Sequence, residues 1–343
     1  MPKSEFWFHL PEEQIAQQPL EHREASRMLV VDRSARAFRD SRFTAFPELV
    51  GERDVVVLND TKVFPARLFG TTETGAKVEI FLVRDEGDGT WQALAKPARR
   101  LRQGKIITFE SGLKAKVVEK SDEGTVTVRF DAGSDVNETI DRVGRTPLPP
   151  YIKRSREEPD SDRQRYQTVY AAKRGSIAAP TAGLHFTPEM ISQVESLGVE
   201  VAKITLHVGY GTFEPVRSDD LSQHRVLAEE VSIDAETAER LNKAKGEGRR
   251  IIAVGTTTTR ALEGNMTKNG RFTEERGFTE LTITPGYRFK AIDALLTNFH
   301  LPESSLLILV STFAGRELIM EAYEHAVAAG YRFYSYGDCM FIV

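Results

Sequence analysis

The stretch SIAAPTAGLHFTPEMISQVESLGVEVAKITLHVGYGTFEPV, residues 176–216, predicts a helix and then a strand, framed by small residues and glycines. Thr187 is a favourable N-cap and Pro188 suits the first helical position. Residues 199–206 are rich in β-branched side chains and predict a strand that ends at His207. Because ligands of open α/β sheets gather outside the carboxyl ends of strands, we expect this segment to border a site.

Two histidines, His185 and His207, mark the ends of this unit, and His300 follows a strand-like segment at 294–300. Each histidine by itself fits a structural role as well as a functional one. Two histidines in glycine-containing loops of one helix–strand unit favour a functional site. Histidine suits proton transfer near neutral pH because its pKa lies there.

Apolar segments and helical segments alternate on both sides of residues 65–150, which predicts a largely parallel sheet with helices on its faces. Short turns such as the one after residues 54–58 separate these elements. The remaining expected strands and helices are strands over 27–31, 227–233, 250–254, 281–284 and 331–336, and helices over 160–171, 234–245, 256 onward, 306–310 and 316–329.

Residues 65–130 have a different texture, with short strands separated by glycine-containing turns and no helical periodicity. This pattern predicts a small antiparallel barrel or sandwich inserted into the α/β fold. We therefore expect an α/β domain with a mostly parallel or mixed sheet, built from residues 1–66 and 152–343, and an inserted all-β antiparallel barrel over 67–151. The expected barrel strands are 77–83, 90–96, 105–109, 113–119 and 125–130.

The composition is that of a soluble globular protein: 343 residues, 40% hydrophobic, 28% charged and a net charge of −4. No apolar run approaches the ~20 residues of a membrane helix, and no secretory leader is visible. The single cysteine, Cys339, indicates a reducing compartment, and we expect a cytoplasmic protein. A monomer is expected, with a dimer as the open alternative.

Three further features are candidate binding elements, each with an ordinary structural alternative. Asn59 and Asp60 end a buried strand and suit a turn equally well. The loop from Gly255 to Arg260, GTTTTR, precedes a helix and has the form of an anion-facing loop, although simple N-capping explains it too. Two basic runs, 96–105 and 153–156, lie near the expected domain junction and favour a polyanion such as RNA over a merely solvated face.

A metal-dependent hydrolase is one competing interpretation, because three histidines can make an open zinc site. No pair of them has the helical i, i+4 spacing, and no cysteine or carboxylate lies at ligand spacing nearby, so we expect no metal. A non-catalytic RNA-binding barrel fused to a scaffold domain is the other alternative.

Eight blocks in order resemble the S-adenosylmethionine:tRNA ribosyltransferase-isomerase family of queuosine biosynthesis, and they span nearly the whole chain. The blocks AAPTAGLHF (178–186) and LTNFHLPES (296–304) are specific to that family, and Thr258 departs from it by replacing a serine. The other six blocks are LNDTKVFPAR (58–67), PLPPYI (147–152), YQTVY (166–170), TLHVG (205–209), VGTT (254–257) and YGD (336–338).

The resemblance implies an α/β domain with an inserted barrel and one reaction. The ribosyl group of S-adenosylmethionine is transferred to 7-aminomethyl-7-deazaguanine in the tRNA anticodon and isomerised, which gives epoxyqueuosine-tRNA, adenine and methionine. S-adenosylmethionine is then a substrate, and no cofactor is implied. A base must remove the proton beside the sulfonium, and an acid must help adenine leave.

We expect His185, His207 and His300 to carry these proton transfers, with Glu214 and Asp293 as alternative bases. Arg260 or Lys62 is expected to engage an anionic group. The expected substrate-binding residues are Asn59, Asp60, Lys62, Arg67, Thr181, Gly183, Gly209, Thr256, Thr257, Arg260, Asn298 and Glu303. The expected tRNA-binding residues are Arg99, Arg100, Arg102, Lys153, Arg154 and Arg156.

Overall fold

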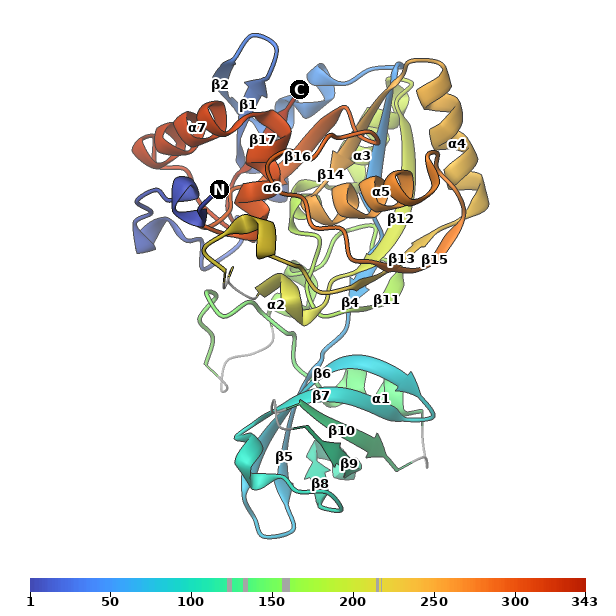
Figure 1. The fold of residues 1–343 in the computed structure, drawn as a ribbon. Helices are drawn as coiled ribbons and strands as arrows, with labels where there is room; N and C mark the ends of the chain where they lie inside the picture. The colour runs from blue at the N-terminus through green and yellow to red at the C-terminus, as the bar shows by residue number, and fades with distance from the viewer. Residues whose placement is uncertain (122–124, 132–134, 156–160, 214–215, 217) are drawn as a thin grey trace.

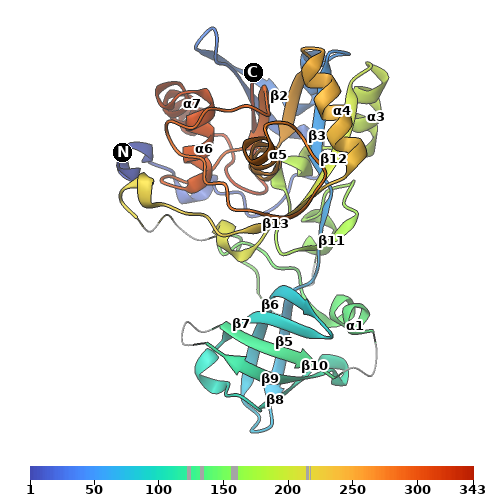
Figure 2. The ribbon, with the colours of Figure 1, turned by 45° about the vertical axis from the view of Figure 1, so that its right-hand side comes forward.

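The chain forms an α/β domain and a β-barrel that lie one above the other and are joined by a narrow neck (Figure 1). The computed structural model describes residues 1–343 apart from 122–124, 132–134, 156–160, 214–215 and 217. The neck contains a two-stranded parallel ribbon of β4 (Thr61–Val63) and β11 (Lys173–Ser176). Figure 2 shows the same separation of the two parts after a turn of the molecule.

A mixed sheet forms the centre of the α/β domain, with nine strands among the described residues in the order β15-β13-β12-β3-β14-β16-β17-β1-β2. The four strands β12, β3, β14 and β16 are mutually parallel neighbours. Antiparallel pairs flank them at β13 on one side and at β17 on the other. The strand bounds are β1 Arg27–Asp32, β2 Ala37–Arg42, β3 Asp54–Asn59, β12 Glu200–His207, β13 Glu229–Ile233, β14 Arg250–Val254, β15 Glu275–Thr279, β16 Ala294–Asn298 and β17 Cys339–Ile342.

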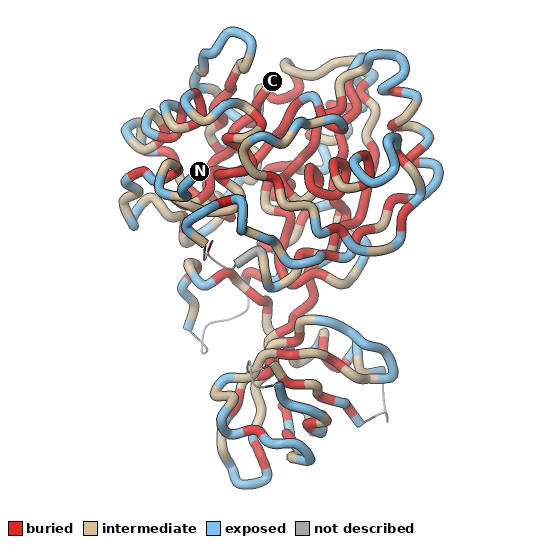
Figure 3. Tube along the Cα trace, viewed as in Figure 1, coloured by how far each residue is buried: buried red, intermediate tan, exposed pale blue. Residues whose placement is uncertain are grey.

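Alternate residues of these strands enter cores on opposite faces of the sheet, as the two-residue repeat of a strand requires. Val55 and Val57 of β3 pack in the core that contains α4, α5, α6 and α7. Val56 and Leu58 pack on the other face with α3 and the aromatic 3₁₀ helix η4. Figure 3 shows the strands as the most continuously buried part of the chain. The bounds are η4 Phe43–Leu49, α3 Pro188–Ser196, α4 Ala235–Gly246, α5 Thr256–Asn269, α6 Ser305–Ala314 and α7 Arg316–Ala328.

Three of these helices begin at a residue whose side chain caps the first turn. Thr187 accepts a hydrogen bond from the Met190 amide at the start of α3. Asp234 caps α4 and Ser304 caps α6 in the same way. No described side chain caps α5, which begins after Gly255 in a conformation with φ of 94° that favours glycine.

The barrel is closed and antiparallel, with strand order β10-β7-β6-β5-β8-β9. Its interior is an apolar core separate from those of the sheet. Helix α1 (Val136–Val143), capped by Asp135, follows the last barrel strand. The expected fold class, a mixed-sheet α/β domain with an inserted antiparallel barrel, is confirmed. The strand bounds are β5 Arg67–Thr72, β6 Lys77–Gly87, β7 Thr90–Lys96, β8 Ile106–Phe109, β9 Lys114–Lys120 and β10 Thr125–Phe130.

Three expected elements are wrong. The helix expected over 160–171 is only α2 (Asp162–Arg165), with residue 160 outside the described part. The strand expected over 281–284 is irregular, because β15 already occupies the edge of β13. The strand expected over 331–336 is also irregular, since Tyr334 has a left-handed φ of 73° that breaks an extended run. The final strand is β17 instead.

Candidate functional site

The carboxyl ends of the four parallel strands bring the predicted site residues to one edge of the sheet. Asn59 ends β3, His207 ends β12, Gly255 follows β14 and Asn298 ends β16. This is the edge at which ligands bind in open α/β sheets. Two cavities lie there, and they share Val208, Ser305 and Leu306 in their walls.

The first, called here the sheet-edge cavity, has a volume of about 350 Å³ and lies beyond β14 and β16. Its walls are largely apolar, with contributions from Ala178, Ala179 and Pro180 of the 178–186 block. Polar groups converge on it from several loops. Of the predicted residues, those that line it are Thr181, Thr256, Thr257, Asn298, His300 and Glu303.

The first turn of α5 borders this cavity with its amide groups and two hydroxyls. Thr258 and Thr259 bond back to the carbonyls of Val254 and Gly255. Thr256 and Thr257 instead line the cavity. Since no described side chain caps α5, the helix presents the positive end of its dipole toward the cavity, where it favours an anionic group.

His300 is the predicted catalytic histidine that lies in the sheet-edge cavity. Its Nε2 is 2.9 Å from the Thr297 hydroxyl, and its backbone amide donates to the Tyr323 hydroxyl at 3.0 Å. Burial lowers the pKa of His300 to about 3, so the imidazole is neutral at neutral pH. The contact to Thr297 orients the neutral imidazole, the contact to Tyr323 holds the backbone beneath it, and the ring can accept a proton from a bound substrate.

Two non-glycine residues with left-handed backbone conformations line the same cavity, Glu303 with φ of 57° and Tyr334 with φ of 73°. The side-chain amide of Asn298 donates to the Tyr334 carbonyl at 2.9 Å. The backbone amide of Glu303 donates to the Phe6 carbonyl at 3.0 Å. Such conformations persist only where the surroundings fix them, and they concentrate at functional sites.

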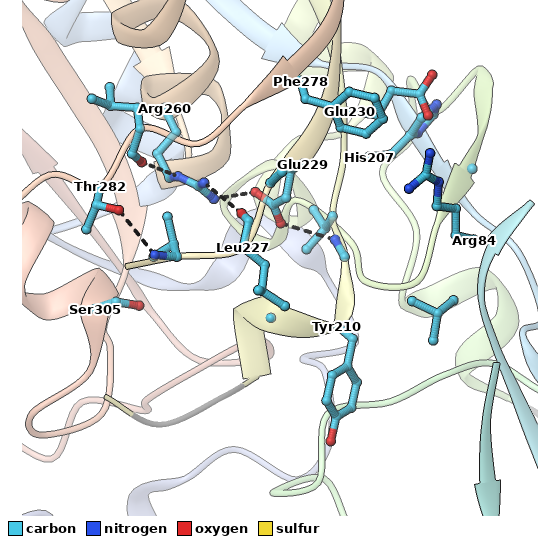
Figure 4. A pocket seen from close by; sticks show the side chains of 18 of the residues that line it. Arg84, His207, Tyr210, Leu227, Glu229, Glu230, Arg260, Phe278, Thr282 and Ser305 are labelled. Carbon is cyan, nitrogen blue, oxygen red and sulfur yellow. Dashed lines mark hydrogen bonds and ion pairs between the residues drawn. The ribbon is translucent and has the colours of Figure 1, made fainter. Parts of the chain in front are cut away.

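The second cavity, the junction cavity, has a volume of about 630 Å³ and lies between the barrel and the sheet (Figure 4). Arg84 and Trp91 line it from the barrel, and Phe278 and Tyr210 line it from the α/β domain. His207 also lines it, with Nδ1 2.7 Å from the Thr61 hydroxyl. Burial lowers the pKa of His207, although the carboxylates of Glu230 and Asp60 oppose that shift.

A buried ion pair forms another wall of the junction cavity. The Arg260 guanidinium donates to Glu229 and to the Leu281 carbonyl, and Glu229 accepts from the Gly209 amide (Figure 4). Arg260 is therefore committed to Glu229, and this pair fixes the chain just after β12. Gly209, whose amide is bonded to Glu229, also lines this cavity.

His185 belongs to the 178–186 block but lines neither cavity. Its Nδ1 is 2.7 Å from the Ser26 hydroxyl, and burial lowers its pKa to about 4. It is 4% exposed and packs on Phe43. The three predicted histidines are thus in three different environments.

Several predicted substrate-binding residues line neither cavity and instead make contacts within the protein near the carboxyl ends of the strands. Asn59 bonds both backbone groups of Leu206 and reaches the Thr257 hydroxyl at 3.4 Å. Asp60 accepts from Thr205. Gly183 is buried against Tyr170, where an added Cβ would lie 2.0 Å from the tyrosine hydroxyl. Lys62 and Arg67 lie in the neck, on β4 and at the start of β5.

The predicted tRNA-binding residues fall into two groups. Arg99, Arg100 and Arg102 lie in or just after a 3₁₀ helix of the barrel, with exposed side chains. Lys153 pairs with Glu12 on the surface. Arg154 is committed to the buried Asp162 through two bonds, at 2.8 and 3.2 Å. Arg156 and the alternative base Glu214 lie outside the described residues.

Sequence reasoning missed Thr297, Tyr323 and Tyr334, which hold His300 and shape the sheet-edge cavity. Thr297 lies in the 296–304 block, three residues before His300. That short spacing could have indicated a contact between the two side chains. The alternative base Asp293 accepts from the Ile251 amide and lines neither cavity.

Nowhere in the described part of the chain do three histidine, cysteine, aspartate or glutamate side chains group as ligands for a metal ion. Of the described helices, none combines the length and the apolar character needed to cross a membrane.

Comparisons with known proteins cover the whole chain. The family model described as "Queuosine biosynthesis protein" matches residues 3–342. S-adenosylmethionine:tRNA ribosyltransferase-isomerase of Trichlorobacter lovleyi is 47% identical over 339 residues, 99% of each chain. The protein of the same name from Natranaerobius thermophilus is 47% identical over 345 residues, covering 100% of this chain and 99% of the relative. The crystal structure of S-adenosylmethionine tRNA ribosyltransferase from Thermotoga maritima is similar with a TM-score of 0.57 and 34% identity, covering 99% of this chain and 100% of that chain.

Proposed function

The chain belongs to the S-adenosylmethionine:tRNA ribosyltransferase-isomerase family of queuosine biosynthesis, and we propose that it modifies 7-aminomethyl-7-deazaguanine in tRNA. The ribosyl group of S-adenosylmethionine is transferred to the aminomethyl nitrogen and isomerised to an epoxycyclopentanediol. The products are epoxyqueuosine-tRNA, adenine and methionine. S-adenosylmethionine is consumed as a substrate, and no cofactor takes part.

The sheet-edge cavity is the observation that carries this proposal. Its volume of about 350 Å³ falls within the range of about 300–1,000 Å³ usual for small-molecule sites. Apolar walls suit the adenosine part, and the uncapped first turn of α5 suits the carboxylate of the methionine part. The hydroxyls of Thr181, Thr256 and Thr257 are at hand for the ribose or the carboxylate.

The junction cavity is the proposed site of the tRNA base. It opens between the two domains and is lined by the aromatic side chains of Trp91, Tyr210 and Phe278, which suit a planar base. Val208, Ser305 and Leu306 line both this cavity and the sheet-edge cavity, so the two adjoin there. Where the cavities adjoin, the aminomethyl nitrogen reaches the ribosyl carbon directly.

The proposed proton transfers follow from the two cavities. His300 removes the proton from the carbon beside the sulfonium, and the electron pair left there opens the ribose as adenine departs. His207 takes a proton from the aminomethyl group, so that the neutral amine attacks the ribosyl carbon. The alkoxide formed on the sugar then displaces methionine from its carbon and closes the epoxide. His185 transfers no proton; its contact to Ser26 anchors the end of the 178–186 block, whose residues 178–182 line the sheet-edge cavity. The imidazolium of His300 returns its proton to the departing adenine, which leaves as the neutral base.

The family acts on tRNA, and the single cysteine of this chain, Cys339, is a buried free thiol. We therefore place the enzyme in the cytoplasm, as a monomer that binds one tRNA across the domain junction.

The test is incubation of the protein with S-adenosylmethionine and a tRNA that carries the deazaguanine precursor, with detection of free adenine. We expect adenine and methionine in equal amounts, and none with an otherwise identical tRNA that lacks the precursor base. The His300→Gln variant should lose about 10²- to 10⁴-fold in kcat while it keeps its affinity for tRNA. Binding of the precursor tRNA without adenine release by the wild type would refute the proposal.

A further inference from the structure

A third cavity lies at the neck and takes no part in the assignments above. It has a volume of about 440 Å³ and lies between the β4–β11 ribbon, the segment 163–169 and helix α1. We call it the basic cleft, because four cationic side chains and one carboxylate, Asp141, line it. The four cations are Arg23, Lys62, Arg163 and Arg174.

The ribbon separates the basic cleft from the junction cavity. Thr61 contacts His207, which lines the junction cavity, whereas the next residue, Lys62, lines the basic cleft. Successive residues of a strand point to opposite faces, so this change is expected. Arg174 pairs with Lys62 across the ribbon and lines the cleft too. Phe64 lines both cavities, so they meet at the end of β4.

Two of the four cations hold the wall of the cleft in place. Arg23 donates to the carbonyls of Gln167 and Gln164 at 2.7 and 2.9 Å, which fixes the segment after α2. Arg174 pairs with Asp141 at 2.9 Å and stacks over Phe64 at 4.5 Å from the ring centroid.

The other two cations, Lys62 and Arg163, are exposed, and neither forms an ion pair with another described residue. Thr168 lines the same cleft with a hydroxyl that is buried and lacks a hydrogen-bond partner among the described residues. In a chain with a net charge of −4, such a concentration of positive charge selects a polyanion.

We propose that the basic cleft binds the phosphodiester backbone of tRNA beside the nucleotide that enters the junction cavity. Lys62 and Arg163 contact phosphate oxygens, and Arg23 and Arg174 keep the wall in shape. The ribbon then stands between backbone and base, so that gripping the phosphates on one face directs the base to the other. This inference rests on the proposed function only in taking tRNA as the macromolecular substrate.

The test measures the Kd for an unmodified tRNA transcript, without S-adenosylmethionine, at several salt concentrations. Lys62→Glu and Arg163→Glu should each raise Kd by roughly tenfold and lower the slope of log K against log salt by about 1. The Asp141→Asn variant should bind the transcript more tightly, because it removes the carboxylate of the cleft while Arg174 stays stacked over Phe64. The matched control, Lys245→Glu on the exposed side of α4, should keep the wild-type Kd.

Competition at constant ionic strength identifies the source of the phosphate. Inorganic phosphate should leave the transcript bound, whereas unlabelled transcript should displace it. Displacement by inorganic phosphate at low concentration would overturn the assignment to a nucleic-acid backbone.

The inference is overturned if the folded Lys62→Glu/Arg163→Glu double variant keeps a Kd within about twofold of wild type. It is also overturned if charge reversal at Arg99 and Arg102 of the barrel weakens binding while the cleft variants do not. Circular dichroism confirms folding of each variant. The binding assay does not measure adenine release. A failure of the proposed reaction and a failure of the basic cleft to bind tRNA are therefore distinguishable.

Discussion

Three histidines of one chain have different chemistry here because their surroundings differ. His300 is buried beside a cavity with its Nε2 held by Thr297, whereas His207 faces the domain junction beside Thr61. His185 is buried next to Ser26 and lines neither cavity. Residue type and local sequence predicted that these histidines matter. Their separation depends on sheet order, since β3 and β14 stand between β12 and β16, and local patterns carry no such information.

Acid should destabilise the protein partly through His185. Burial lowers its pKa from 6.5 to about 4, so below the ordinary value the unfolded chain binds a proton that the folded chain does not. The free energy of unfolding should therefore fall as pH drops from 6.5 toward about 4, by roughly 3 kcal/mol from this residue. Urea unfolding of wild type and His185→Gln across that window measures this effect, and the variant should show a shallower dependence.

His9→Gln, at an exposed histidine, is the control and should keep the wild-type dependence on pH. Parallel curves for wild type and His185→Gln would show that burial of this imidazole has no such effect.

Gly175 leaves room for the His207 ring. A Cβ at this position would lie 2.7 Å from two atoms of the imidazole, closer than real contacts allow. The Gly175→Ala variant should displace the ring from Thr61, cost about 1–3 kcal/mol of stability and lower the rate of adenine release about tenfold or more. Gly277→Ala, where no heavy atom lies within 4 Å of the added Cβ, is the matched control. Equal rates for the two variants would contradict a role for the His207 position.

At the scale of elements, the sequence predicted well where local signals and tertiary packing agree. Thr187 and Pro188 start α3 as expected, and the apolar runs at β3 and β14 are buried parallel strands. The barrel was predictable from its short strands and glycine turns, although its first strand, β5, was not recognised. That strand contains Gly70, whose close contacts to β8 leave no room for a Cβ, so packing decides it more than propensity.

The two expected strands that did not form share one physical cause, which is competition from another segment for the same pairing partner. The aromatic run 331–336 alternates like a strand, yet the rings of Tyr331 and Phe333 pack against Phe299. Cys339–Ile342 takes the place between β16 and β1 that this run would need. Pairing partners decide such cases, and a single segment does not reveal them.

The return from the barrel is anchored by one buried carboxylate. Asp162 is 3% exposed, accepts two bonds from Arg154 and accepts one from the Tyr336 hydroxyl at 2.6 Å. The Asp162→Asn variant should lose about 3 kcal/mol of stability, because it leaves the Arg154 charge partly buried and uncompensated. Urea unfolding checks this expectation.

The exposed pair of Lys243 and Glu247 provides the comparison. Glu247→Gln should change stability by no more than about 0.5 kcal/mol, since surface ion pairs contribute little. Similar losses in the two variants would mean that Asp162 is not an anchor.

At the scale of the molecule, the two domains divide the proposed work. The α/β domain alone builds the sheet-edge cavity at the ends of β14 and β16, while the barrel contributes Arg84 and Trp91 to the junction cavity. The neck ribbon lies between the junction cavity and the basic cleft. A polynucleotide bound at the neck can thus place its base in the junction cavity, next to a small substrate in the adjoining sheet-edge cavity.

A crystal structure of the protein with bound S-adenosylmethionine would test most directly the central claim that the sheet-edge cavity binds this substrate. We expect the ligand in the sheet-edge cavity, with its carboxylate at the first turn of α5 and the carbon beside the sulfonium facing His300. A ligand bound in the junction cavity or elsewhere, with the sheet-edge cavity empty, would contradict the account.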